Sequence, residues 1–236
     1  MGKNSEGSGK NDVVYILKRD VEPDELRYSL RSLQNFPHGK VWFFTGCPAG
    51  FKPDRHVPFE QTGLRKWEKA TSTYRAIAET DEVSEDFWMF NDDFFVLEPV
   101  EELPYMYHGR LAALIASIRS KHGASSYSRM LDRARLQLEE RKLDSLNYCL
   151  HVPMLFNKKK VLEVLKEFPN SPMFRSLYGN YCKVGGVEAN DCKVYDLESV
   201  PAEGQKLCST YDVSFKDGKA GEWIRRRFPD PSKWEE

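Results

Sequence analysis

The chain has 236 residues, of which 40% are hydrophobic, 13% aromatic and 30% charged. This composition is that of a globular protein, and it excludes disordered, collagenous and coiled-coil chains. The 35 basic and 36 acidic residues give a net charge of −1, so no overall field attracts a polyanion. No stretch approaches the roughly 18 apolar residues that a transmembrane helix needs, so we expect no membrane span.

The first segment, 1–11, is rich in Gly, Ser, Lys and Asn and lacks the apolar core of a signal peptide. We therefore expect a flexible tail over 1–11, followed by a single domain over 12–236. The five cysteines include no Cys-x-x-Cys pair. Without an export signal, reduced thiols and a cytoplasmic location are the expected state.

Short apolar runs alternate with helical patterns along the chain. The predicted strands are 13–17, 41–44, 87–90, 94–97, 148–152, 193–197 and 207–210. The predicted helices are 25–33, 64–79, 111–118, 130–143, 158–168, 173–181 and 221–228. The first strand–helix–strand unit favours an α/β fold with a mixed, mostly parallel sheet and flanking helices. We expect a helical insertion at about 105–145.

The segment 90–94 (Phe-Asn-Asp-Asp-Phe) places two adjacent carboxylates, Asp92 and Asp93, between aromatic runs. Uncompensated burial of carboxylates is costly, so they should lie at an exposed strand end or be neutralised by a cation. Ligands of open α/β sheets bind at the carboxyl ends of strands. Hard oxygen ligands suit Mg²⁺ or Mn²⁺ bound together with substrate phosphates. The segment therefore indicates a metal–diphosphate site, with a solvated turn as the alternative.

Several blocks of the sequence, taken in order, resemble one family of transferases. The blocks are 12–15, 24–32, 90–93, 151–153 and 174–176. They resemble the Stealth family of sugar-phosphate transferases, which includes capsular polysaccharide phosphotransferases and the N-acetylglucosamine-1-phosphotransferase that tags lysosomal enzymes. The chain also resembles short glycosyltransferase-like proteins carried by phages. The resemblance covers about 12–100 and 148–180 and implies a GT-A-type nucleotide-diphospho-sugar fold. The run 16–20 departs from the family's Trp-Val-Asn/Asp-Gly type pattern, which leaves the reaction type open.

The resemblance also implies roles for individual residues. By similarity to the DxD motif of GT-A enzymes, Asp93 would ligate Mn²⁺ or Mg²⁺ together with Asp92. Asn91 or Asp92 would contact the donor ribose or complete the site through water. His151 would be a general base or a metal ligand, with a structural histidine as the alternative. Arg175 would neutralise the diphosphate as its bond breaks, with a surface helix arginine as the alternative.

Further basic and acidic residues are candidates for substrate contacts. Arg27 and Arg31 are four residues apart on one helical face, where two guanidinium groups can grip a phosphate. A solvated face paired with neighbouring acids is the alternative. Arg19 is a further substrate-binding candidate, and Asp212 is a further acid or base candidate. The arginine run 225–227 is interpreted as a solvated face.

Together these features predict a metal-dependent glycosyltransferase that moves a sugar from a nucleotide-diphospho-sugar donor to an acceptor hydroxyl. Transfer of the sugar 1-phosphate is the alternative, and a non-catalytic nucleotide-sugar-binding module is the second alternative. Free nucleoside diphosphate would identify glycosyl transfer, and the monophosphate would identify phosphosugar transfer. A glycan, a protein or a modified DNA base all remain open as the acceptor, and the sequence does not indicate an oligomeric state.

Overall fold

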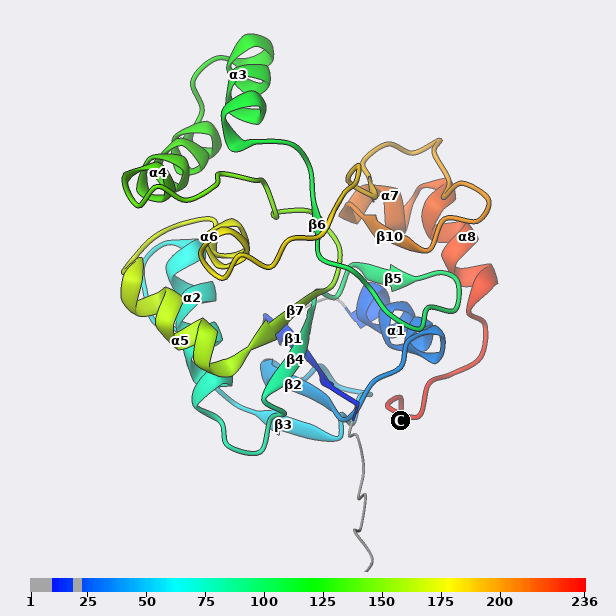
Figure 1. The fold of residues 1–236 in the computed structure, drawn as a ribbon. Coiled ribbons are helices and arrows are strands. Elements are labelled where there is room, and N and C mark those ends of the chain that lie inside the picture. Colours follow the sequence, from blue (N-terminus) through cyan, green and yellow to red (C-terminus); the bar gives the residue numbers. More distant parts are fainter. Residues whose placement is uncertain (1–9, 19–22) are drawn as a thin grey trace, which may run out of the picture.

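The structure is a computed structural model that describes residues 10–18 and 23–236. Its centre is a five-stranded sheet in the order β3-β2-β1-β4-β7 (Figure 1). The strands are β1 (Asp12–Leu17), β2 (Val41–Thr45), β3 (Arg55–Val57), β4 (Asp86–Phe90) and β7 (Met154–Asn157). The first four are parallel, and β7 runs antiparallel to β4. The mixed, mostly parallel sheet predicted from the sequence is thus confirmed.

Helices cover both faces of this sheet, as Figure 1 shows. On β1, Val14 packs in the core that includes α2 and α5, whereas Val13 and Tyr15 pack in the core that includes α1. Burial on both faces explains why the strands read as continuous apolar runs rather than as alternating patterns. The covering helices are α1 (Pro23–Ser32), α2 (Lys66–Glu79) and α5 (Lys158–Glu167).

A second, three-stranded sheet of order β5-β10-β9 lies beside the first. Its strands are β5 (Phe94–Val96), β10 (Leu207–Thr210) and β9 (Lys193–Val194), followed by helices α7 (Asp212–Lys216) and α8 (Lys219–Arg227). The remaining elements are the 3-10 helix η1 (Leu33–Asn35), the strand pair β6 (Met106–Tyr107) and β8 (Val187–Glu188), and helices α3 (Leu111–His122), α4 (Ser126–Glu140) and α6 (Phe174–Tyr181). Helices α3 and α4 project together from one side of the molecule (Figure 1).

One predicted strand is wrong. The segment 148–152 is irregular, and β7 begins only after it. Its backbone N–H groups donate to side chains rather than to a neighbouring strand. The Tyr148 N–H donates to Ser176 Oγ and the His151 N–H donates to Asp191 Oδ1, both at 3.1 Å. The apolar pattern therefore marked a buried segment correctly but assigned it the wrong conformation.

Several short elements escaped prediction, because two to five residues carry too little periodicity. They are η1, β3, β6, β8 and α7. Among the described residues, no helix combines the length and the apolar character needed to cross a membrane.

Candidate functional site

A cluster of acidic side chains lies where β4 ends. Asp92 and Asp93 form a turn in which the Phe94 N–H donates to the Asn91 carbonyl at 3.2 Å. This turn carries the chain from the large sheet into β5 of the small sheet. The two carboxylates thus lie at the carboxyl edge of the parallel strands, where ligands of open α/β sheets bind.

Asp93 is held by the small sheet. Its Oδ2 accepts a hydrogen bond from Ser209 Oγ and an ionic hydrogen bond from Lys193 Nζ, each at 2.8 Å. Ser209 and Lys193 are register partners on the neighbouring strands β10 and β9. Because Asp93 is only 9% exposed, the Lys193 ammonium supplies the neutralising charge that a buried carboxylate requires.

Glu25 of α1 and Asp92 complete the acidic cluster. Burial, together with the charges of Asp93, Asp92 and Asp212, raises the pKa of Glu25 to about 7, although the hydrogen bond from Thr210 Oγ1 at 2.8 Å opposes this shift. Burial also raises the pKa of Asp92 to about 6, with a contribution from Asp93. Two carboxyls that exchange protons near neutral pH are suited to acid–base chemistry.

The cluster does not fit a divalent cation as it is arranged. Lys193 already forms an ion pair with Asp93, so a metal ion would compete with its ammonium group for the same carboxylate. Over residues 10–18 and 23–236, no group of three or more His, Cys, Asp or Glu side chains is placed to hold a metal ion.

His151 pairs with Asp191. Its Nδ1 lies 2.7 Å from Asp191 Oδ2, and both side chains are 33% exposed. Although burial opposes it, the hydrogen bonds and charge of His151 lower the pKa of Asp191, so the carboxylate remains ionised. A carboxylate on Nδ1 favours the tautomer with its proton there, which leaves the Nε2 lone pair available.

The short segment 191–193 joins the histidine pair to the acidic cluster. Asp191 holds His151, and two residues later Lys193 holds Asp93. Between them, Cys192 Sγ donates to the His151 carbonyl at 3.2 Å. A candidate base and a candidate charge-neutralising group are therefore positioned by one stretch of three residues.

Arg175 lies beneath the His151 segment rather than on an open helix surface. Its Nη2 donates to the Val152 carbonyl at 2.6 Å, while its buried Nε has no hydrogen-bond partner among the described residues. Burial lowers the pKa of this guanidinium. Because Val152 adjoins His151, Arg175 supports the backbone that presents the imidazole; its contact with a diphosphate stays a prediction.

The predicted arginine pair of α1 contacts the end of the chain. Arg27 and Arg31 both form ion pairs with Glu235, at 2.5 and 2.7 Å. Arg31 also donates to the carbonyls of Phe228 and Pro229. These contacts anchor the last residues of the chain on α1 and use both guanidinium groups.

The other predicted residues have mixed positions. Asp212 is exposed at the start of α7, and its charge contributes to the raised pKa values of Glu25 and Asp92. Asn91 is exposed in the turn after β4. Arg19 lies outside the described residues.

Sequence reasoning missed Glu25, Asp191 and Lys193. Glu25 lies in the first turn of α1, where acidic residues are common, and only the folded chain brings it to Thr210. Asp191 and Lys193 belong to no local motif, and their partners are 40 and 100 residues away in sequence. The spacing of residues within one segment gave no signal for such pairs.

Comparisons with known proteins identify the fold. No protein-family model matches the chain, and no curated protein matches it. A solved structure of the galactosyltransferase LgtC in complex with donor and acceptor sugar analogs is similar, with a TM-score of 0.50 and 10% sequence identity over 95% of this chain and 98% of that one. The glycosyltransferase GlyE of Streptococcus pneumoniae TIGR4 matches at a TM-score of 0.40 and 10% identity, over 94% of this chain and 50% of that chain. Its apo form gives 0.45 and 12% identity, over 92% of this chain and 60% of that chain.

The present chain thus spans about half the length of the first GlyE structure. At these identities the similarity establishes the fold alone. The GT-A-like fold predicted from the sequence is confirmed by the match to LgtC. The finer resemblance to Stealth and phage proteins stays a resemblance of sequence.

Proposed function

We propose that this chain is a glycosyltransferase that uses a nucleotide-diphospho-sugar donor. The observation that carries the proposal is the meeting of the acidic cluster, Lys193 and the His151–Asp191 pair at the carboxyl edge of a GT-A-type sheet. The LgtC structure, which has this fold, is described as a complex with donor and acceptor sugar analogs, and this supports the proposal.

The donor diphosphate gathers negative charge when the sugar leaves it, so the site needs cations where that charge develops. Lys193 has a side chain that is 13% exposed and already lies in the cluster. Lys18, exposed directly after β1, is close enough to Asp92 to affect its pKa. We assign these two ammonium groups to the donor phosphates.

The acceptor hydroxyl must lose a proton as it attacks the sugar. In the proposed step, His151 Nε2 accepts that proton while the acceptor oxygen bonds to the anomeric carbon. The bond from this carbon to the phosphate oxygen breaks, and its electron pair leaves with the nucleoside diphosphate. Asp191 stabilises the protonated imidazole through Nδ1. Asp92, Glu25 and Asp212 are the remaining candidates for the base.

Mn²⁺ or Mg²⁺ at Asp92 and Asp93 was the expectation from the sequence. The arrangement of Asp93 with Lys193 does not fit that expectation, and no step above passes through a metal ion. Donor binding measured with Mn²⁺ and with a chelator tests the difference.

The deciding experiment incubates the full chain with a panel of nucleotide sugars and simple acceptors and analyses the nucleotide released. Nucleoside diphosphate supports the proposed glycosyl transfer. Nucleoside monophosphate identifies sugar 1-phosphate transfer, which is the first alternative. Stabilisation by a donor without turnover indicates a binding module, and no donor response at all contradicts the proposal. At a hundredfold excess over Kd, a bound donor should stabilise the fold by about 2.7 kcal/mol.

A further inference from the structure

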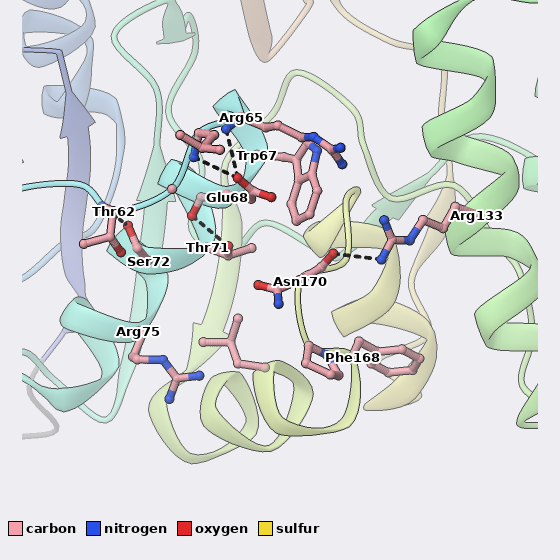
Figure 2. Close-up of a pocket in the computed structure, with 14 residues that line it drawn as sticks. Thr62, Arg65, Trp67, Glu68, Thr71, Ser72, Arg75, Arg133, Phe168 and Asn170 are labelled. Atoms are coloured by element: carbon pink, nitrogen blue, oxygen red, sulfur yellow. Dashed lines mark hydrogen bonds between the residues drawn. The ribbon is translucent and has the colours of Figure 1, made fainter.

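A surface groove lies between the start of α2, helix α4 and the end of α5. It consists of two adjoining pockets with volumes of 590 and 380 Å³, and Arg65, Trp67 and Arg133 line both. Figure 2 shows the larger pocket. We call this feature the arginine groove, and its characteristic residues are Arg65, Trp67, Arg75, Arg129, Arg133 and Asn170.

Among the described residues, the groove contains more guanidinium groups than carboxylates, and Glu68 is the acid whose charge lies near Arg65 and Arg133. Arg65 and Arg129 have no carboxylate within ion-pair distance among residues 10–18 and 23–236. Within the part of the chain that the structure describes, Arg133 donates only to the Asn170 carbonyl of the loop after α5. Arg75 reaches Glu79 at 3.8 Å, with both side chains more than half exposed, which is a weak pair. These guanidinium groups are therefore available to an anionic ligand.

The one acid in the lining is already used by the fold. Glu68 Oε2 accepts the backbone N–H groups of Leu64 and Arg65, both at 2.9 Å, at the start of α2. These hydrogen bonds lower the pKa of Glu68, so it remains an ionised helix cap. The Trp67 ring has two guanidinium groups nearby, since the Cζ atoms of Arg65 and Arg133 both lie 5.8 Å from its centroid.

Neutral polar groups add to the charged ones. The Thr71 hydroxyl donates to a helix carbonyl at 2.9 Å, which leaves its lone pairs free to accept. The Ser72 hydroxyl donates to a helix carbonyl at 2.8 Å and already accepts the Thr62 N–H at 3.1 Å. Asn170 has a left-handed backbone with φ of 53°, and its side-chain amide has no hydrogen-bond partner among the described residues. In Figure 2 this amide lies in the middle of the pocket, between Trp67 and Phe168.

We propose that the arginine groove binds an acidic saccharide. Guanidinium groups recognise carboxylates and phosphates through paired hydrogen bonds, an indole ring packs against the apolar face of a sugar, and hydroxyl and amide groups bond to sugar hydroxyls. A nucleic acid is the less suitable polyanion, because the chain has a net charge of −1 and lacks the overall basic character of nucleic-acid-binding domains.

We assign the saccharide as the acceptor, and this assignment rests on the proposed function. Arg129 lines the smaller pocket from the first turns of α4. Helix α4 packs against α6, and Arg175 of α6 donates to the Val152 carbonyl beside His151. Helix α4 thus lines the groove and packs on the helix that supports the His151 segment.

The test is calorimetric titration of the full chain without donor or added metal. The probes are oligogalacturonate, its fully methyl-esterified form, glucose 6-phosphate and a single-stranded oligonucleotide. The two acidic sugars distinguish a carboxylate from a phosphate as the recognised group. The variants are the double substitution Arg65→Gln with Arg133→Gln, and Arg55→Gln as the control, since Arg55 is an exposed arginine of β3 outside the groove.

Wild type and Arg55→Gln should bind at least one acidic sugar, with affinity that falls as salt rises. The double variant should bind it at least about tenfold more weakly, the scale of one lost charge-assisted hydrogen bond, and esterification should weaken binding similarly. Equal affinity of wild type and the double variant overturns the proposal. So does failure of wild type to bind either acidic sugar, or tighter binding of the oligonucleotide. If the double variant does not fold, Arg129→Gln replaces it under the same criteria.

Failure of this proposal is distinguishable from failure of the proposed function. Acidic sugars that bind the groove without turnover of any nucleotide sugar leave the groove standing and refute the transferase. Sugar transfer by a chain that binds no acidic sugar supports the transferase and refutes the proposed role of the groove.

Discussion

At the residue scale, a structural role and a catalytic role for His151 predict opposite effects of its substitution on stability and turnover. It is one-third exposed and held through Nδ1 by Asp191. We expect His151→Gln to leave the melting temperature nearly unchanged and to lower turnover by about 10²–10⁴, the usual scale for a lost acid–base group. Turnover per folded molecule is the measurement.

His56→Gln is the matched control, because His56 is an exposed histidine of β3 whose ring makes only a 3.5 Å contact with a backbone carbonyl. It should behave as wild type in both assays. Normal turnover by folded His151→Gln protein would leave Asp92, Glu25 or Asp212 as the base.

Lys193 carries the second prediction. If its ammonium neutralises Asp93 and meets the donor phosphates, the thermal shift produced by a nucleotide sugar should be the same with Mn²⁺ and with EDTA. Lys193→Met should lose most of that shift. Combining it with Asp93→Asn removes both charges of the buried pair, so this double variant should regain stability but not donor binding.

Lys219→Met is the control, since Lys219 forms an exposed ion pair with Glu198 outside the cluster. A wild-type donor shift that requires Mn²⁺ would reinstate the metal site expected from the sequence and remove Lys193 from its proposed role.

At the scale of elements, the end of the chain is fastened to α1 by Glu235. Burial alone would raise the pKa of this carboxyl, but hydrogen bonds from Arg31, the Ser232 backbone and Arg27 lower it from 4.5 to about 2. A carboxyl with a depressed folded-state pKa stabilises the fold above its unfolded pKa. This contribution is therefore present above about pH 4.5 and is lost as the pH falls toward 2.

Glu235→Gln should lower the free energy of unfolding at pH 7 by about 2 kcal/mol, the scale of charge-assisted hydrogen bonds, and should flatten the acid limb of stability. Denaturant unfolding between pH 2 and 7 measures both effects. Glu236→Gln changes the adjacent exposed carboxylate and should have little effect. Equal stabilities of the two variants would show that the anchor contributes nothing.

Helix α6 fixes the irregular segment that carries His151. A Cβ added at Gly179 would lie 2.4 Å from the ring of Tyr148, which is 2% exposed. We expect Gly179→Ala to cost about 1–3 kcal/mol through overpacking and to lower turnover by displacing the segment toward His151. Melting temperature and turnover should fall together; an unchanged melting temperature would contradict the close packing.

At the scale of the whole molecule, the balance of charge makes a prediction about nucleic acids. With a net charge of −1, the chain should not retain duplex DNA at about 0.15 M salt, where non-specific binding depends on many basic contacts. Electrophoretic mobility shift is the measurement. Retention of random-sequence DNA at this salt would favour the DNA base among the acceptors that the sequence left open.

The sheet was predictable because β1, β2 and β4 are buried on both faces and read as continuous apolar runs. The position of Asp92 and Asp93 at its edge followed from the same pattern. Their partners did not, because Lys193 and Glu25 reach the cluster only when the small sheet and α1 pack beside it. The segment 148–152 failed for a related reason: its backbone is satisfied by distant side chains, which no local pattern encodes.

The segment 191–193 has a consequence for how such a site is inherited and engineered. Since Asp191 and Lys193 hold two different groups from positions two apart, inserting or deleting one residue here would release the imidazole and the buried carboxylate in a single event. A point substitution can alter the Asp191–His151 contact or the Lys193–Asp93 contact alone, whereas a change of length alters both. Natural or designed variants of this chain can therefore change these two contacts one at a time, by substitution, only while the length of the segment stays fixed.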